Sequence, residues 1–297
     1  MAGFDAHTTP AQRRRVVAVI VIAVLGISSS AVLVRLMDAS ALTIAFWRMV
    51  GAAMLVSVFS GRALGRLTPR DVPSVALAGV ALAVHFWAWF ASVQFTTVLR
   101  STLFVSLVPM WTALLEALRG QGWPDLRQRL GFAVVFAGLL VIEGLGAAER
   151  VGDLALLGDG LAIFAGGLWA IYLSIGRRIR RDLPVTVYFG AVCAFGAVAL
   201  GAIAGIRGEV ATLLTVDAPT AGLIGLAILG PQLLGHQGFA YAIRWVDATS
   251  ISLLMLLEPV GATTLALLVF RERPSAAAVL GGFVVLIGVA YATVRAR

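Results

Sequence analysis

Long apolar runs fill this chain, and short polar segments separate them. A helix needs about 20 apolar residues to cross the roughly 30 Å hydrocarbon core of a bilayer. Ten runs approach or exceed that length, at residues 16–36, 41–60, 72–94, 97–118, 130–146, 154–176, 186–206, 219–243, 248–270 and 275–294. The pattern predicts an all-α membrane protein with ten transmembrane helices and no separate soluble domain.

The composition supports the same class of protein. Hydrophobic residues make up 60% of the chain and charged residues 13%, whereas soluble domains carry about 25% charged residues. The single Cys193 allows no intramolecular disulfide and fits no metal cluster. The net charge of +8 does not indicate nucleic acid, because the arginines lie in short loops between apolar runs. We expect no cofactor and no nucleic-acid partner.

The arginines predict the orientation in the membrane. If the N-terminus is cytoplasmic, sixteen arginines fall in inner segments and four, at 150, 207, 271 and 273, fall in outer segments. Cytoplasmic loops carry the excess of positive charge, so both termini are expected inside. Arg13–Arg15 followed by Ser29-Ser30-Ala31 also resembles a signal peptide. The apolar character continues through Val34, and we therefore favour an uncleaved first helix.

The chain repeats itself with an offset of 150 residues. The matched pairs are Leu103 and Leu253, Pro109 and Pro259, Leu115 and Leu265, Leu118 and Leu268, Pro124 and Pro274, Gly131 and Gly281, Val134 and Val284, Val135 and Val285, and Gly138 and Gly288. We expect a cytoplasmic tail at 1–15, a first five-helix repeat at 16–146, a linker at 147–153 and a second repeat at 154–297. Because five spans per copy is an odd number, the second copy is predicted to be inverted, as in many transporters.

Three local patterns accompany the repeat: the mid-span prolines, Glu272-Arg273 after the ninth span, and Phe46-Trp47-Arg48 in the second. Together with two five-helix halves, they resemble the drug/metabolite transporter superfamily, EamA type. The first copy departs from the pattern, with Gly122-Trp123 in place of the Glu-Arg pair. Within the superfamily the chain is most similar to bacterial amino-acid exporters of the YddG type, which implies export of aromatic and other neutral amino acids.

Pro109 and Pro259 are candidates for a hinge or helix bend. A proline within a helix donates no backbone hydrogen bond and clashes with the carbonyl four residues earlier. Matched positions in both halves favour a role in the moving parts. The alternative is a kink that only shapes helix packing.

Glu258 and Arg48 are charged residues inside predicted spans. Glu258 lies about 15 Å into its span by helix rise, where a charge costs about 2.5–3.5 kcal/mol unless it meets water, a partner or a proton. It could bind a substrate's ammonium group or take part in proton coupling, or it could form an ion pair with Arg48. Arg48 could hold a substrate carboxylate, pair with Glu258, or extend to the membrane surface.

Histidines, aromatic residues and one hydroxyl complete the candidates for a substrate cavity. They are His85, Trp89, Ser106, Trp169, Tyr172 and His236. Flat rings would suit apolar or aromatic parts of a substrate. The alternatives are interhelical hydrogen bonds for the histidines, the interfacial aromatic belt for the tryptophans and tyrosine, and a bond back to its own helix for Ser106.

The sequence therefore predicts a secondary transporter of the bacterial inner membrane that exports amino acids or related small metabolites by alternating access. A facilitative, channel-like pathway is the alternative, although no carbonyl filter or ring of charges is present. An intramembrane enzyme is a weaker alternative, because the chain lacks GxSxG, HExxH and paired carboxylates. The substrate, its direction and the energy source stay open.

Overall fold

The computed structural model describes residues 9–60, 67–120, 122–145, 153–179, 183–242, 245–246 and 254–293. Across these ranges the chain is helical and contains no β-strand. The first half contains α1 (Pro10–Leu36), α2 (Ala41–Ser60), α3 (Val72–Phe95), α4 (Val98–Val105), α5 (Val108–Leu118) and α6 (Leu126–Leu145). The second half contains α7 (Ala155–Ile179), α8 (Val185–Arg207), α9 (Val210–Leu214), α10 (Ala218–Ala227), the π-helix η3 (Ile228–Gln237), α11 (Gly238–Ala242), α13 (Leu257–Phe270) and α14 (Ala276–Thr293).

Seven helical segments among the described residues are long and apolar enough to cross a membrane. They are Pro10–Leu36, Ala41–Val58, Val72–Phe95, Val98–Leu118, Ala155–Gly176, Val185–Arg207 and Ala218–Gln237. Two shorter apolar helices cover Leu257–Phe270 and Ala276–Ala292. The prediction of an all-α, multi-pass architecture is confirmed, whereas the number of ten spans and their orientation stay predictions.

Local signals explain several helix ends. The Thr9 side chain accepts from the Gln12 amide while the Gln12 side chain accepts from the Thr9 amide, a capping box that starts α1. Asp217 caps α10 by accepting from the Thr220 amide at 3.1 Å. Gly208, at φ 70°, ends α8 in the left-handed region that favours glycine.

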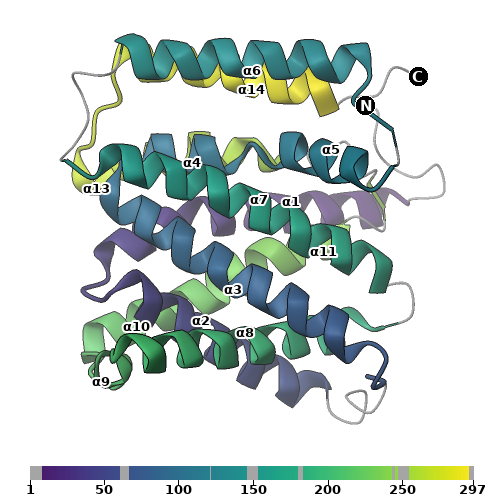
Figure 1. The fold of residues 1–297 in the computed structure, drawn as a ribbon, viewed down its shortest axis with the longest axis vertical. Helices are drawn as coiled ribbons and strands as arrows, with labels where there is room; N and C mark the ends of the chain where they lie inside the picture. Colours follow the sequence, from purple (N-terminus) through teal and green to yellow (C-terminus); the bar gives the residue numbers. More distant parts are fainter. Residues whose placement is uncertain are drawn as a thin grey trace.

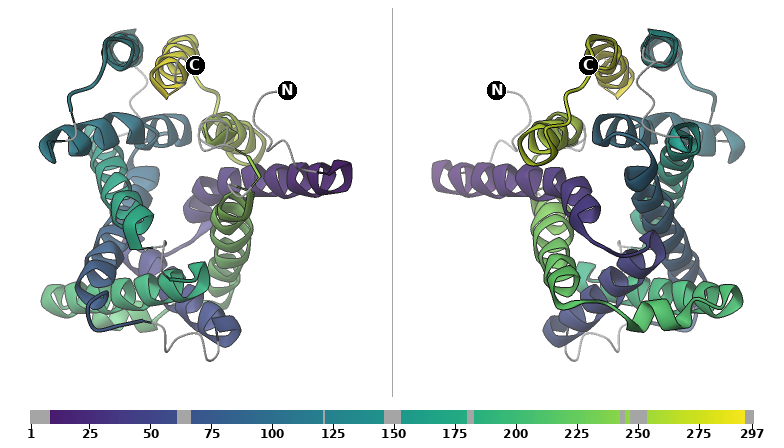
Figure 2. Two further views of the ribbon diagram at one scale, coloured as in Figure 1. Left: turned by 90° about the vertical axis from the view of Figure 1, so that its right-hand side faces the viewer. Right: turned by 90° about the vertical axis from the view of Figure 1, so that its left-hand side faces the viewer.

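The helices surround a central region. Figure 2 shows α3 and α7 on one side of it and α1 with η3 on the other, while α4, α5 and α13 lie across one edge and α2, α8 and α10 across the opposite one. The packing follows this arrangement. Helix α7 contacts α3, α4 and α5, and α1 contacts η3 and α13. Helix α2 contacts α8 and α10, and α3 contacts α8.

Helices α6 and α14 form a pair at the margin of the molecule (Figure 1). Their backbones meet at glycines. A Cβ on Gly131 would lie 2.8 Å from the carbonyl oxygen of Gly288, and one on Gly138 would lie 2.7 Å from that of Gly281. The residue number rises in α6 as it falls in α14, so the two helices run antiparallel. Small residues let backbones approach this closely between membrane helices.

Candidate functional site

Helix interruptions lie beside both matched prolines. Helix α4 ends at Val105, and α5 begins at Val108 with Pro109 as its second residue. In the second half α13 begins at Leu257, two residues before Pro259. The predicted continuous span 97–118 is therefore two helices, because Pro109 has no N–H to donate to the Val105 carbonyl.

A π-helix interrupts the predicted span 219–243 in the same way. Residues Ile228–Gln237 form η3, which contains Pro231. The wider turn of a π-helix changes which side chains face inward, and such segments are common at functional sites. Here η3 brings Gln232 and His236 to the central region. The only sequence signal for this interruption is Pro231 itself.

A cavity of about 150 Å³ lies between α1, α3, α4, α5, α7, η3, α13 and α14. We call it the central cavity. Seven residues singled out from the sequence line it: His85, Trp89, Ser106, Pro109, Trp169, His236 and Glu258. Pro259 is buried and does not line it. Sequence reasoning missed Ser30 and Phe86, which also line it; Ser30 lay in the serine run that resembled a cleavage site.

A second cavity of about 170 Å³ adjoins the first and shares Phe86, Trp169 and His236 with it. Tyr172, which the sequence had also suggested as a cavity residue, lines this second cavity together with Gln232. The second cavity lies toward the end of the bundle where α7 ends and α8 begins, since Leu173 and Val185 line it.

Rings form a continuous wall from α3 across α7 to η3. The His85 and Trp169 centroids are 5.0 Å apart, and the Trp169 and His236 centroids are 5.1 Å apart. His85 stacks on Trp89 with a 14° interplanar angle and a 6.3 Å centroid distance. Such spacings lie within or near the favourable range for aromatic pairs. The wall gives the cavity a flat apolar side.

The residues of this wall and of the nearby cavity lining also carry polar atoms. The His85 Nδ1 lies 2.8 Å from the Ala165 carbonyl oxygen; because a carbonyl only accepts, Nδ1 carries the proton and Nε2 is the ring's acceptor when His85 is neutral. The Trp89 indole N–H is buried without a hydrogen-bond partner among the described residues. The Ser106 hydroxyl donates to the Thr102 carbonyl at 2.7 Å, the bond back to its own helix that we had considered.

Glu258 lies in the first turn of α13 and is half-buried at the central cavity. Its ion pair with Arg48, considered above, is absent between these two described residues. A carboxylate at an apolar, membrane-buried site is costly without a counter-charge. Glu258 therefore offers the cavity an acceptor for a cation or a proton.

Arg48 lies behind the cavity wall rather than in its lining. Its side chain is fully buried and does not extend to the membrane surface, so that expectation is wrong. The guanidinium donates to the Gln232 Oε1 at 3.2 Å and to the Ser30 Oγ at 3.1 Å. It also lies over the Phe86 and Phe90 rings, at 4.7 and 5.0 Å from their centroids. Its Nη2 atom has no partner within the described part of the chain.

Comparisons with known proteins identify the family. The EamA-like transporter family matches residues 14–144 and again 156–294. An "Uncharacterized transporter" of Archaeoglobus fulgidus is 25% identical over 257 residues, 85% of this chain and 87% of that protein. The "Uncharacterized transporter YyaM" of Bacillus subtilis is 26% identical over 224 residues, 73% of this chain and 72% of that protein.

One solved crystal structure of another protein shares the fold. Its TM-score is 0.59 at 19% identity, over 94% of this chain and 96% of that chain. The family matches cover both halves of the sequence. The relatives are named as transporters, and the match extends over most of their length. The chain thus belongs to the EamA-like transporter family, and it is a multi-pass membrane transporter rather than an enzyme.

Proposed function

We propose that this chain is a secondary transporter that exports amino acids, aromatic and other neutral ones, or related small metabolites, across the bacterial inner membrane by alternating access. The observation that carries the proposal is the central cavity, with one carboxylate facing an aromatic wall. Pockets of this kind, mostly apolar with a few convergent polar groups, are the usual form of small-molecule sites.

The polar groups suit the two ends of an amino acid. Glu258 would accept from the ammonium group by a charge-assisted hydrogen bond. Arg48 places a positive charge behind Ser30 and Gln232, which favours the carboxylate on that side. Trp89 and Trp169 would cover the apolar side chain. These assignments deepen the family-level conclusion that the substrate is a small molecule.

Alternating access requires two halves that can exchange conformations. We propose that residues 16–146 and 154–297 are inverted copies, with the region 1–15 and the linker 147–153 outside them. The packing supports this: α7 contacts α3 as α1 contacts η3, and α7 contacts α4 and α5 as α1 contacts α13. The antiparallel α6 and α14 are the last helices of the two copies.

Under this proposal Pro109 and Pro259 mark hinges. Each lies within three residues of a helix start, where the backbone hydrogen bonding is interrupted and a change of direction costs little. Both termini are cytoplasmic in the proposal, as the arginine distribution predicts. The inner face then corresponds to the end where the second cavity lies, since α7 runs inward.

Transport by purified protein in liposomes tests the proposal. Uptake of labelled phenylalanine should saturate and be competed by unlabelled leucine, whereas a channel-like pathway would give flux that rises linearly with concentration. Counterflow, in which an internal unlabelled amino acid accelerates uptake of the labelled one, is expected only of a carrier. If no internal amino acid of a panel accelerates uptake of the labelled one, amino acids are refuted as the substrate class.

A further inference from the structure

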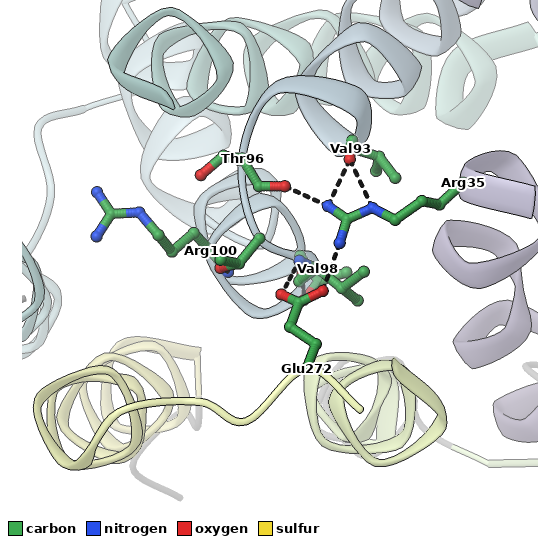
Figure 3. A network of polar contacts seen from close by, with 8 residues as sticks. Arg35, Val93, Thr96, Val98, Arg100 and Glu272 are labelled. Atoms are coloured by element: carbon green, nitrogen blue, oxygen red, sulfur yellow. Dashed lines mark hydrogen bonds and ion pairs between the residues drawn. The ribbon is translucent and has the colours of Figure 1, made fainter. Parts of the chain in front are cut away.

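A polar network joins five elements at one end of the bundle, which we call the latch end. There α1 and α3 end, α4 and α7 begin, and the loop after α13 passes by. Figure 3 shows Glu272 reaching from that loop toward Arg35 and the α4 N-terminus. The network comprises Arg35, Thr96, Arg100, Asp159 and Glu272.

Arg35, the penultimate residue of α1, is the centre of one half of the network. Its guanidinium forms an ion pair with the Glu272 carboxylate and donates to the carbonyls of Val93, at 2.6 and 3.1 Å, and of Thr96. The other Glu272 oxygen accepts from the Val98 amide at 3.0 Å. Glu272 thus binds an arginine and the N-terminal end of α4 at once, an end that favours negative charge.

Asp159, in the first turns of α7, is the centre of the other half. Its carboxylate accepts from the Arg100 guanidinium, with an Nη2–Oδ2 distance of 2.5 Å, and from the Thr96 hydroxyl at 2.9 Å. All three side chains are buried. Thr96 joins the two ion pairs, because its carbonyl accepts from Arg35 while its hydroxyl donates to Asp159.

In both ion pairs of the network, the cation and the carboxylate come from different halves of the sequence. Both cations, Arg35 and Arg100, lie before residue 146, and both carboxylates, Asp159 and Glu272, lie after residue 153. The family model matches the same two stretches separately. Any motion that separates the two stretches at this end must therefore break both ion pairs. The Arg100–Asp159 pair is buried, and breaking it leaves uncompensated charge, whereas the Arg35–Glu272 pair is partly exposed.

The network lies beyond the central cavity along the helices. Thr96 is seven residues after Trp89, about 10 Å by helix rise, and Asp159 is ten residues before Trp169, about 15 Å. The second cavity lies on the opposite side, where α7 ends. The structure therefore combines polar closure at the latch end with hollow space toward the other end.

We propose that this network is a latch: Glu272 and Asp159 hold the central cavity closed at the latch end, and breaking their contacts opens that end. The inference rests on the proposed function for the pathway that the latch closes. It also assigns a role to Glu272, which the sequence alone presented only as part of a Glu-Arg pair.

The Glu272 contact has no counterpart at the equivalent position of the first stretch. The position equivalent to Glu272 in the first stretch is Gly122, followed by Trp123 in place of Arg273. Neither residue offers a carboxylate, so this position of the first copy cannot contact an arginine and a helix N-terminus as Glu272 does. Among the described residues, one contact at the opposite end is a hydrogen bond from Arg119 to the Ser174 hydroxyl.

Thiol accessibility in the full-length protein tests the latch. In a Cys193→Ser background, Ser106→Cys places a reporter thiol in the central cavity. A membrane-impermeant thiol reagent is applied from each side, to spheroplasts and to inverted vesicles. We expect the parent to react from the side opposite the latch. Glu272→Gln should raise the reaction rate from the latch side about tenfold or more, because two charge-assisted contacts are weakened.

Glu209→Gln is the matched control, since Glu209 pairs with Arg207 at an exposed site outside the network. It should leave the rate unchanged. Asp159→Asn answers the same question independently if Glu272→Gln does not give a monodisperse protein in detergent. Equal latch-side rates for the parent and both network variants would overturn the latch. A parent thiol that reacts from neither side would overturn the transport pathway as well.

Discussion

Replacing Glu258 by Gln isolates one charge in the central cavity. Glutamine has nearly the same shape and keeps an acceptor oxygen, so the packing of α13 against α1 is retained. Glu258 is half-buried in the cavity lining and lacks an ion pair with Arg48. The substitution should therefore remove the proposed interaction with the substrate while leaving the packing of the fold in place.

The size of the effect follows from the contact that is lost. A hydrogen bond to a charged group contributes about 1.5–3 kcal/mol, and about 1.4 kcal/mol corresponds to a factor of ten in affinity. For an amino acid whose ammonium group meets Glu258, the apparent KM should rise roughly 10- to 150-fold. 3-Phenylpropionate lacks the ammonium group, so its affinity as a competitor should be the same for the wild-type and E258Q proteins.

Counterflow of labelled phenylalanine in proteoliposomes measures this change, with the unlabelled amino acid and 3-phenylpropionate as competitors. Glu209→Gln removes a carboxylate at an exposed position outside the cavity and serves as the control. An E258Q protein with the wild-type KM for phenylalanine would refute the assignment of Glu258 to the ammonium group. A loss of affinity that is equal for both competitors would instead indicate a general change in cavity shape.

Three further substitutions test other parts of the structure. Trp169→Leu should weaken competition by aromatic amino acids more than by alanine, because it removes the ring in the cavity wall, while Trp123→Leu at an exposed position should change neither. Gly138→Val should cost about 1–3 kcal/mol through overpacking and lower the melting temperature in detergent, unlike Gly222→Val, where a Cβ meets nothing within 4 Å. Arg48→Gln should weaken binding of amino acids but not of their carboxamides, measured by competition; an equal loss for both would contradict a role toward the carboxylate.

The sequence predicted the helical class and seven of the sixteen residues that line the central cavity, for a simple reason. Apolar runs are long and continuous in a membrane protein, and polar residues within them are expensive enough to mark functional positions. His85, His236 and Glu258 were identified in this way, and each lines the central cavity. Pro109 was identified from the repeat and lies beside a helix interruption.

Other features depend on contacts that no local pattern records. Arg48 and Gln232 are separated by 184 residues and Arg35 and Glu272 by 237, so neither pair could be derived from helix spacing. The sequence placed Arg48 by its depth in a span, whereas burial behind Ser30 depends on how α1 and η3 pack. The widened helix η3 was missed because, apart from Pro231, its composition is that of an ordinary apolar run.

The burial of Arg48 has a consequence for biogenesis. Helix α2 enters the bilayer with a cation whose insertion costs about 2.5–3.5 kcal/mol, and one of its two hydrogen-bond acceptors, Gln232, is synthesised 184 residues later. At about 5–20 residues per second, that acceptor leaves the ribosome roughly 10–40 s afterwards. Until then the nascent N-terminal portion holds its arginine with Ser30 and the Phe86 and Phe90 rings alone. Truncated chains that end before η3 should therefore be preferred targets for membrane proteases.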